Sequence, residues 1–335
     1  MRAWALEDGF GVEKVRMVER PEPRPGPGEV RVRIRAASLN YRDLLMVKGL
    51  YNPRLQLPRV LLSDGAGEVL EVGPGVTRFA PGQRVVGCFF QRWSAGEIDP
   101  EGAKSALGGE LDGVLAEQVV LREEGLVHAP EHLSLEEAAC LPCAALTAWN
   151  ALVEGGLVAG ETVLVLGTGG VSSFAIQIAA LSGARAIVTS RSAAKLEKAR
   201  ALGARELIDT GKTPEWDKRV LELTGGRGVD HVVEVGGTGT LPRSLKAVRL
   251  GGKVHMIGVL SGGSGELSLF PVIMKGVLLR GVFVGSRAMF EAMNRAFAAA
   301  GTRPLIDRTW PAGEVQEALR ALERAEHAGK LVIQV

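Results

Sequence analysis

Residues 163–181 constrain the fold more than any other part of the chain. An apolar run over 163–166 enters a glycine-rich turn, and residues 174–181 then continue with helical periodicity. A strand that passes through such a turn into a helix is the local structure of a dinucleotide fingerprint, although Ser172 replaces its third glycine. The turn and the helix N-terminus offer free N–H groups to a pyrophosphate. We therefore predict a nucleotide-binding unit whose pyrophosphate contacts are Gly167, Thr168, Gly169, Gly170 and Val171.

The end of the next strand indicates which dinucleotide binds. Residues 186–190 form this strand, about 20 residues after the turn, where an NAD-binding fold carries an acid for the ribose 2′-hydroxyl. This chain has Ser190 and Arg191 there, with Lys195 one turn further. A hydroxyl and two cations suit a 2′-phosphate. We expect NADP(H) rather than NAD(H), the alternative being that Arg191 and Lys195 are solvated charges at a helix start.

Length and composition exclude several other classes of protein. The 335 residues suffice for two domains, and 46% hydrophobic and 23% charged residues are typical of a soluble globular enzyme. A net charge of +2 indicates no nucleic-acid partner. The N-terminus lacks the apolar core of a signal peptide, no apolar run reaches the roughly 18 residues of a membrane span, and three cysteines cannot form a disulfide framework. We expect a cytoplasmic protein with a small-molecule substrate and no membrane partner.

Two patterns divide the chain. Residues 1–127 contain short strands separated by Gly and Pro, such as 29–35, where arginines alternate with apolar residues and indicate one solvated face. From residue 162, helices separate strands predicted at 162–166, 185–189, 206–208, 230–235, 252–258 and 277–283. This alternation predicts an α/β fold with a parallel doubly wound sheet beside a β-rich domain. Residues 135–152 read as one helical stretch, and 330–335 as a last strand that returns to the N-terminal domain.

Motifs along essentially the whole chain resemble those of the medium-chain dehydrogenases/reductases. They are the glycine-rich run 65–76, the segment 79–85, the segment 141–148 with its spacing to Gly167, and the closing segment 328–333. The resemblance implies a GroES-like catalytic domain over 1–127 and 287–335, with a Rossmann NADP-binding domain inserted over 128–286. It also implies further cofactor contacts at Thr147, Gly236, Gly258, Val259, Val284, Gly285 and Ser286.

Zinc-dependent members of this family hold a catalytic zinc with Cys, His and Cys, and this chain departs at two of the three positions. Asn40 corresponds to the first cysteine and Ser63 to the histidine, while Cys143 is retained. The four-cysteine lobe for a structural zinc is also missing. One thiolate with an amide and a hydroxyl is a poor zinc site, so we expect no metal. The alternative is an atypical site that combines Cys143 with Asp43 and Asp64.

The cluster Asn40-Tyr41-Arg42-Asp43 follows an apolar strand, where the family places its substrate cleft. It offers an amide, a phenol, a guanidinium and a carboxylate, and it resembles the corresponding run of polyketide-synthase enoyl reductases and quinone oxidoreductases. We predict that these four residues form the catalytic site and that Tyr41 donates the proton. The alternative is that Arg42 and Asp43 pair to tie the loop down and that Tyr41 only packs.

Without zinc, hydride transfer to an isolated carbonyl lacks its main electrophile. A conjugated alkene or a quinone is activated by its own carbonyl, and hydrogen bonds can stabilise the resulting anion. The sequence therefore predicts a zinc-independent, NADPH-dependent reductase of quinones or electron-poor C=C bonds. A zinc-type alcohol dehydrogenase and a non-catalytic NADPH-binding protein remain as alternatives. The apolar strand 277–283 would leave an open sheet edge, which relatives pair across a two-fold axis, so we expect a homodimer or a tetramer of dimers.

Overall fold

The last strand of the chain pairs with a strand near its beginning. In the computed structural model, which describes all 335 residues, β16 (Lys330–Gln334) runs antiparallel to β3 (Glu29–Ser38), with Val332 opposite Ser38. Two ends of a chain can share one sheet only if the sequence between them leaves that sheet and returns. The prediction that the last strand returns to the N-terminal domain is confirmed.

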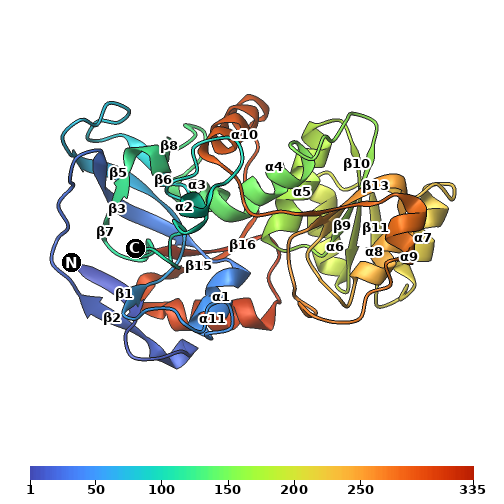
Figure 1. Cartoon of the computed structure of the whole chain (residues 1–335), viewed down its shortest axis with the longest axis horizontal. Helices are drawn as coiled ribbons and strands as arrows, with labels where there is room; N and C mark the ends of the chain where they lie inside the picture. Colours follow the sequence, from blue (N-terminus) through green and yellow to red (C-terminus); the bar gives the residue numbers. More distant parts are fainter. The chain divides into compact units, whose positions relative to one another are not determined.

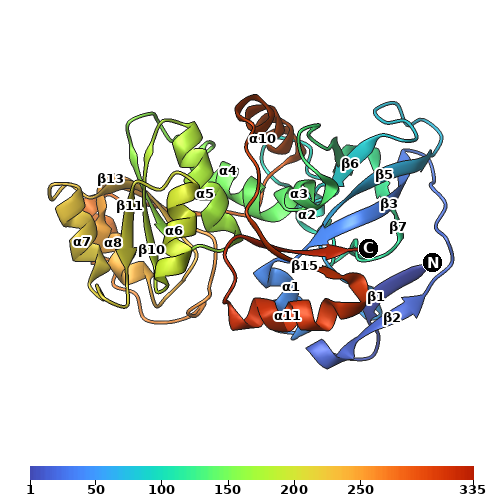
Figure 2. The same ribbon diagram turned by 180° about the vertical axis from the view of Figure 1, so that it is seen from behind.

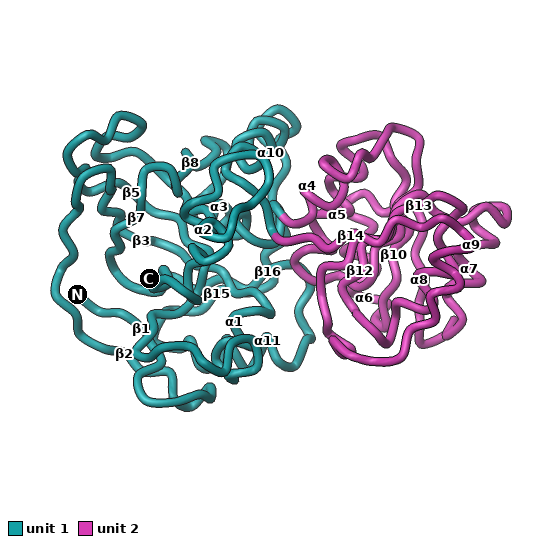
Figure 3. Tube along the Cα trace, viewed as in Figure 1, with its two compact units in different colours: residues 1–146, 284–335 teal, residues 147–283 magenta.

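The chain divides into two units, which Figure 3 shows in different colours. Unit 1 comprises Met1–Leu146 and Val284–Val335, and unit 2 comprises Thr147–Phe283. The predicted cofactor domain, residues 128–286, extends beyond unit 2 at both ends, because residues 128–146 and 284–286 lie with unit 1. The Ser38 hydroxyl donates to the Ala139 carbonyl at 2.9 Å, and this bond is one of those that hold the segment there.

Unit 1 is built on two β-sheets. The larger sheet has the order β15-β16-β3-β5-β6-β8, with β7 also paired to β3, and the smaller has the order β2-β1-β4. In β3, Arg33 and Arg35 are exposed while Val32 and Ile34 are buried, so the predicted solvated face is confirmed. The remaining strands are β1 (Arg2–Leu6), β2 (Val15–Glu19), β4 (Arg59–Val60), β5 (Asp64–Val72), β6 (Arg84–Gly87), β7 (Gln118–Arg122), β8 (Leu126–His128) and β15 (Ile306–Pro311).

Several helices accompany the sheets of unit 1. They are α1 (Tyr41–Val47), α2 (Pro100–Ala103), α3 (Leu135–Ala138), α10 (Arg287–Ala300) and α11 (Val315–Arg324). Of these, α3 packs on β3 and β5. In α11 the buried side chains are Val315, Ala318, Leu319 and Leu322, the spacing of one helix face. That face packs into the apolar core of the unit, which also contains β3 and β16 side chains.

The predicted helical stretch 135–152 is interrupted. After α3, a π-helical turn over Leu141–Ala145 leads into α4 (Leu146–Leu152). Pro142 lies in this turn and has no N–H to donate to the carbonyl four residues earlier, so the regular helical pattern cannot continue through it.

Unit 2 is a six-stranded parallel sheet with helices packed on it, as Figures 1 and 2 show from opposite sides. The strands are β9 (Thr162–Leu166), β10 (Arg185–Ser190), β11 (Glu206–Asp209), β12 (Val229–Glu234), β13 (Val248–Met256) and β14 (Leu278–Gly281). Their order, β11-β10-β9-β12-β13-β14, is that of a doubly wound dinucleotide-binding sheet. Every residue of the central strand β9 is buried. The predicted fold class is confirmed.

The helices of unit 2 form two groups. α5 (Gly170–Leu181) and α6 (Ala193–Ala201) pack on β9, β10 and β11, whereas α8 (Leu241–Ala247) and α9 (Phe270–Lys275) pack on β12 and β13. α7 (Trp216–Leu223) packs on α8. No helix of the chain has both the length and the apolar content that a membrane crossing requires.

Candidate functional site

The fingerprint turn between β9 and α5 is shaped for close approach of a ligand. Gly167 has φ +72°, a left-handed conformation, and a Cβ at Gly167 or Gly169 would meet no atom within 4 Å. The first backbone bond of α5 runs from the Ser173 N–H to the Gly169 carbonyl, so the N–H groups of residues 170–172 have no acceptor within the helix. This space and these donors fit a pyrophosphate.

Ser172 replaces the glycine that allows close packing of helix and strand in the fingerprint. It is buried, and its hydroxyl donates to the Leu166 carbonyl at 2.7 Å. The side chain therefore bridges the start of α5 to the end of β9. A serine is accommodated because its hydroxyl satisfies a backbone acceptor at the turn.

The three residues predicted to hold a 2′-phosphate lie together where β10 ends and α6 begins. Ser190 and Lys195 are half-buried, and Arg191 is exposed. The Ser190 hydroxyl accepts the Ser192 N–H at 3.3 Å. Asp209, at the end of β11, is paired with Ser190 in register. The sequence analysis missed this neighbouring acid, because the register of two parallel strands is a tertiary property.

Asp209 is itself engaged with its own loop. Its Oδ1 accepts the Gly211 N–H at 2.9 Å, and its Oδ2 lies 3.9 Å from the Lys212 ammonium. The carboxylate therefore closes the turn after β11. The corner retains a hydroxyl and two cationic side chains, the groups that suit a phosphate dianion.

A buried carboxylate organises the loop after β12. Glu234 is fully buried, and its Oε1 accepts the N–H groups of Gly236 at 2.8 Å and Gly237 at 3.1 Å. The hydroxyls of Thr240 and Ser244 also donate to this carboxylate. The N–H of Gly236, a predicted cofactor residue, is thus committed to Glu234 and shapes the loop.

The loop after β13 approaches the loop after β12 closely. A Cβ at Gly258 would lie 2.4 Å from the Val235 carbonyl oxygen, so only glycine fits there. Val259 follows it and is 47% exposed. These predicted cofactor residues line the carboxyl ends of neighbouring parallel strands, the edge where such sheets bind ligands.

The predicted cofactor residues 284–286 form a strained corner in unit 1. Val284 has φ +51°, which is rare for a β-branched residue, and such strain is typical of functional sites. A Cβ at Gly285 would come within 2.8 Å of the Leu146 side chain. The Ser286 hydroxyl then accepts the Met289 N–H and caps α10. Thr147 is buried at the start of unit 2.

The predicted catalytic cluster forms the first turn of α1. Asn40 is the N-cap, and its N–H donates to the Asp43 Oδ2 at 2.8 Å. Burial raises the pKa of the Asp43 carboxyl to about 6, with Arg42 opposing this rise and Asp64 adding to it. Asp43 therefore holds the start of the helix in place, as the structural alternative supposed.

Arg42 and Tyr41 have different environments. The Arg42 guanidinium donates to the Leu107 carbonyl at 2.7 Å and lies over the rings of Phe89 and Tyr51, with 4.8 and 5.5 Å to the centroids. Its Nη1 is 4.0 Å from Asp43 Oδ1. These contacts tie α1 to the neighbouring loops. Tyr41 is 38% exposed, so it is not part of the buried core.

Lys330, which no motif in the sequence indicated, lies against this cluster. Lys330 is only 2% exposed, and its Nζ donates to the Leu39 carbonyl at 2.7 Å and to the Asn40 Oδ1 at 2.5 Å. The Asp64 Oδ2 lies 3.9 Å from the same ammonium. In the sequence, Lys330 is marked only by its position in the closing strand. That position does not indicate the direction of its side chain.

Asp64 completes this arrangement. It is fully buried; its Oδ1 accepts the Ser63 hydroxyl at 2.6 Å, and its Oδ2 accepts the Cys143 N–H at 3.2 Å. Of the three positions that correspond to zinc ligands, Ser63 and Cys143 are thus hydrogen-bonded to Asp64, and Asn40 is hydrogen-bonded to Lys330. The Asp64 carboxylate and the Lys330 ammonium form an ion pair at 3.9 Å between them.

The residues at these positions do not fit a zinc ion. No three His, Cys, Asp or Glu side chains of the chain lie together in a way that could hold a metal. Desolvation, reinforced by Asp64, raises the pKa of the Cys143 thiol, which disfavours the thiolate that zinc requires. The charged hydrogen-bond donor near these positions is the Lys330 ammonium, and this cation would repel a zinc ion.

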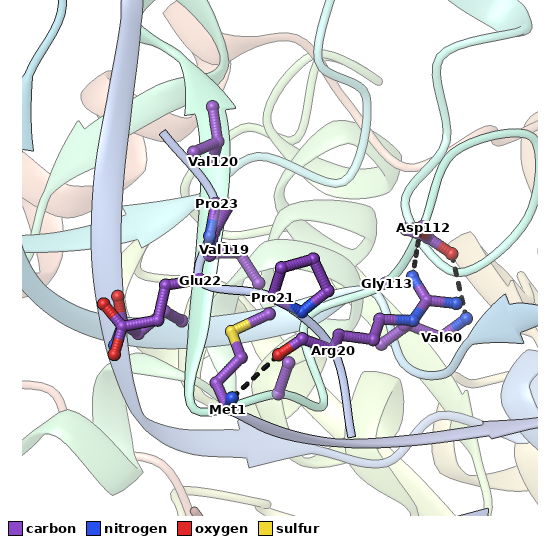
Figure 4. A pocket seen from close by; sticks show the side chains of 12 residues that line it. Met1, Arg20, Pro21, Glu22, Pro23, Val60, Asp112, Gly113, Val119 and Val120 are labelled. Atoms are coloured by element: carbon purple, nitrogen blue, oxygen red, sulfur yellow. Dashed lines mark hydrogen bonds and ion pairs between the residues drawn. The ribbon is translucent and has the colours of Figure 1, made fainter. Parts of the chain in front are cut away.

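A separate pocket of about 360 Å³ lies elsewhere in unit 1 (Figure 4). Arg20 pairs with Asp112 across it at 2.8 Å, and the N-terminal ammonium of Met1 donates to the Arg20 carbonyl. Its lining contains none of the predicted site residues, and Glu22 in the lining pairs with Arg31 outside it. We assign it no chemistry.

Comparison with known proteins agrees with the geometry. Residues 26–131 match the alcohol dehydrogenase GroES-like domain, and residues 170–299 match the zinc-binding dehydrogenase family. A zinc-type alcohol dehydrogenase-like protein of Schizosaccharomyces pombe is 44% identical over 307 residues, covering 90% of this chain and 89% of that protein. An acryloyl-coenzyme A reductase of Metallosphaera sedula is 33% identical, covering 89% of each.

Solved structures show the same likeness. An NAD-dependent alcohol dehydrogenase is 39% identical with a TM-score of 0.93, covering all of both chains. The 2-octenoyl-CoA carboxylase reductase in complex with NADP and 2-octenoyl-CoA is 27% identical with a TM-score of 0.89, covering 99% of this chain and 87% of that one. The chain therefore belongs to the medium-chain dehydrogenase/reductase superfamily, whose members are oxidoreductases that bind a nicotinamide cofactor.

Proposed function

We propose that this protein is a zinc-independent reductase that uses NADPH to reduce electron-poor C=C bonds or quinones. One observation carries the proposal: the zinc-ligand positions hold an amide, a hydroxyl and a protonated thiol around the buried Lys330–Asp64 pair. An isolated carbonyl would find no metal there to polarise it. A conjugated alkene or quinone brings its own activating carbonyl, so hydrogen bonds can stabilise the anion that hydride addition creates.

The cofactor in this proposal is NADP(H), which supplies the hydride when bound. The turn over 167–171 would hold the pyrophosphate, and Ser190, Arg191 and Lys195 would hold the 2′-phosphate. In unit 2, the closely packed loops at Gly258 would contact the nicotinamide half. In unit 1, the strained corner at Val284 is a separate proposed contact for the cofactor.

On the substrate side, Asn40 and Tyr41 are the proposed hydrogen-bond and proton donors. The Tyr41 residue is 38% exposed, and Asn40 has an amide N–H₂ without a partner. Arg42 and Asp43, engaged in α1, would support these two by holding the helix start. Quinone reduction needs little acid assistance, so the proton donor matters most for an enone or an enoyl thioester.

Some of the similar proteins support the proposed substrate class, whereas others are named for a different class of substrate. The acryloyl-coenzyme A reductase and the 2-octenoyl-CoA carboxylase reductase are named for α,β-unsaturated thioesters. The S. pombe protein and the NAD-dependent enzyme are named for alcohols, which keeps an alcohol dehydrogenase as the second candidate. The misfit of the ligand positions to zinc favours the reductase.

The deciding experiment is a screen of NADPH oxidation by chelator-dialysed protein over quinones, enones, enoyl thioesters and aldehydes, with elemental analysis of the same sample. We expect turnover of conjugated alkenes or quinones at full rate without zinc. Stoichiometric zinc that restores aldehyde reduction would instead establish an alcohol dehydrogenase. Tight NADPH binding with no turnover of any compound would establish a non-catalytic binding protein.

We also propose that the protein is a homodimer joined along β14. This strand ends the sheet of unit 2 and pairs only with β13, and Leu278 within it is 53% exposed. The adjacent helix α9 buries no residue, and its Phe270, Ile273 and Met274 are 76%, 72% and 73% exposed. The open edge of β14 and the exposed apolar residues of the helix that precedes it both favour burial against a partner, and a second copy would pair the two strand edges.

A further inference from the structure

A buried hydrogen-bond donor at the start of α1 has no partner. The Nδ2 of Asn40 is enclosed and makes no hydrogen bond, although the residue is nine-tenths buried. Leaving such a donor without a hydrogen bond destabilises the folded state, so a buried unpaired donor in a native fold calls for an explanation. The other end of the same amide is well satisfied, because Oδ1 accepts from the Lys330 ammonium.

The chemistry of lysine determines which way this amide faces. An ammonium can only donate hydrogen bonds, so the group that faces Lys330 must be the amide oxygen. Lys330 is held in turn by the Leu39 carbonyl at 2.7 Å and by Asp64 at 3.9 Å. The Nδ2 of Asn40 therefore points away from Lys330. Its two N–H groups can donate hydrogen bonds, but no acceptor in the protein is paired with them.

We propose that Lys330 is a positioning residue that fixes the Asn40 amide as a hydrogen-bond donor to the carbonyl oxygen of the substrate. This inference rests on the proposed reductase function and deepens it. Hydride addition at the far carbon of a conjugated C=C bond places negative charge on that carbonyl oxygen. A pre-oriented N–H in a buried site stabilises this charge without having to reorient during the reaction.

The first test replaces the donor and keeps the shape. Asn40→Asp retains an oxygen toward Lys330 but has no N–H to offer, and it preserves the attraction to the ammonium. We expect kcat on the best enone or enoyl thioester to fall about 100-fold, as when one oxyanion-stabilising donor is removed. NADPH affinity should stay within about twofold. The matched control is Asn294→Asp on α10, whose amide donates only to the His128 carbonyl; it should retain wild-type kcat.

The second test removes the orienting cation. Lys330→Met alone would leave Asp64 buried without its partner charge, so it is combined with Asp64→Asn to keep the site neutral. The amide can then rotate, and we expect kcat to fall about tenfold or more, with partial recovery in Lys330→Arg. Lys275→Met is the control, because that ammonium also donates to backbone carbonyls but caps α8 in unit 2.

A spectroscopic readout separates orientation from general damage. The probe is 2-cyclohexenone labelled with ¹³C at its carbonyl, bound with NADP⁺ so that no turnover occurs. We expect its carbonyl stretch to lie lower in wild type than in Asn40→Asp or in the Lys330→Met/Asp64→Asn protein. An Asn40→Asp enzyme within threefold of wild-type kcat and with an unchanged stretch would overturn the donor role.

The remaining outcomes are also distinct. If Asn40→Asp is impaired while the Lys330→Met/Asp64→Asn protein matches wild type in both kcat and stretch, the positioning role of Lys330 is refuted. If the wild type reduces no alkene or quinone, the reductase function fails. The stretch of bound cyclohexenone then still decides whether Asn40 donates to a carbonyl.

Discussion

The buried carboxyl of Asp43 should make the stability of the protein depend on pH, and this dependence can be measured directly. Its carboxyl is 3% exposed, and burial raises its pKa from 3.8 to about 6. Between these pH values the folded protein keeps a proton that the unfolded chain has released. The Asp43 contribution to stability therefore decreases as pH rises from about 4 to about 6 and stays low above that. A shift of about two pKa units corresponds to about 3 kcal/mol.

The variant Asp43→Asn removes this dependence and keeps the fold. Its side-chain oxygen can still accept the Asn40 N–H that Asp43 accepts at 2.8 Å. The free energy of unfolding of the variant, minus that of wild type, should therefore increase by about 2 kcal/mol between pH 4 and pH 7, because the unfolded carboxyl is already partly ionised at pH 4. Urea unfolding of both proteins, followed by circular dichroism at each pH, gives this difference, in which the other titrating groups cancel.

Asp230 supplies a control of opposite sign. Burial acts to raise its pKa, but hydrogen bonds from Arg227, the Thr162 N–H and Arg249 outweigh burial and lower it to about 2. Its stabilising contribution is complete above about pH 4 and is lost only as pH falls toward 2. Asp230→Asn should thus be less stable than wild type by a constant amount from pH 4 to 7. A flat difference for Asp43→Asn over the same range would refute the burial of an ionised carboxylate at the start of α1.

Three further predictions concern the cofactor, the proton donor and the assembly. Wild type should bind NADPH at least tenfold more tightly than NADH, about 1.4 kcal/mol, and Arg191→Ala should weaken NADPH alone; fluorescence titration with an unchanged ratio would contradict the assignment. Tyr41→Phe should lower kcat on an enone by about 10²–10⁴-fold without changing NADPH affinity, and a loss of less than threefold would remove Tyr41 from the mechanism. Light scattering should show a dimer or tetramer at micromolar concentration and a smaller species for Ile273→Asp; a wild-type monomer would rule out pairing along β14.

The local patterns of the sequence were sufficient for the fold. Alternation of arginine with valine and isoleucine in β3, the strand–turn–helix around Gly167, and the regular strand–helix period after residue 162 each depend on neighbouring residues only. Side-chain periodicity and glycine conformations are local properties, so they can be read before any tertiary contact is known. The departure of Asn40 and Ser63 from zinc-ligand residues came instead from the family resemblance, which identifies the positions to compare.

Only the tertiary structure determined the contacts between segments that are distant in the sequence. Lys330 meets Asn40 across 290 residues because β16 pairs with β3, and no local pattern states that pairing or the inward direction of the lysine. Asp209 lies beside Ser190 through strand register, and Arg42 is committed to the Leu107 carbonyl through loop packing. The fold determines whether a polar side chain can donate a hydrogen bond to a ligand or is already bonded within the protein. The groups around that side chain come from segments that are far apart in the sequence, so no local pattern predicts them.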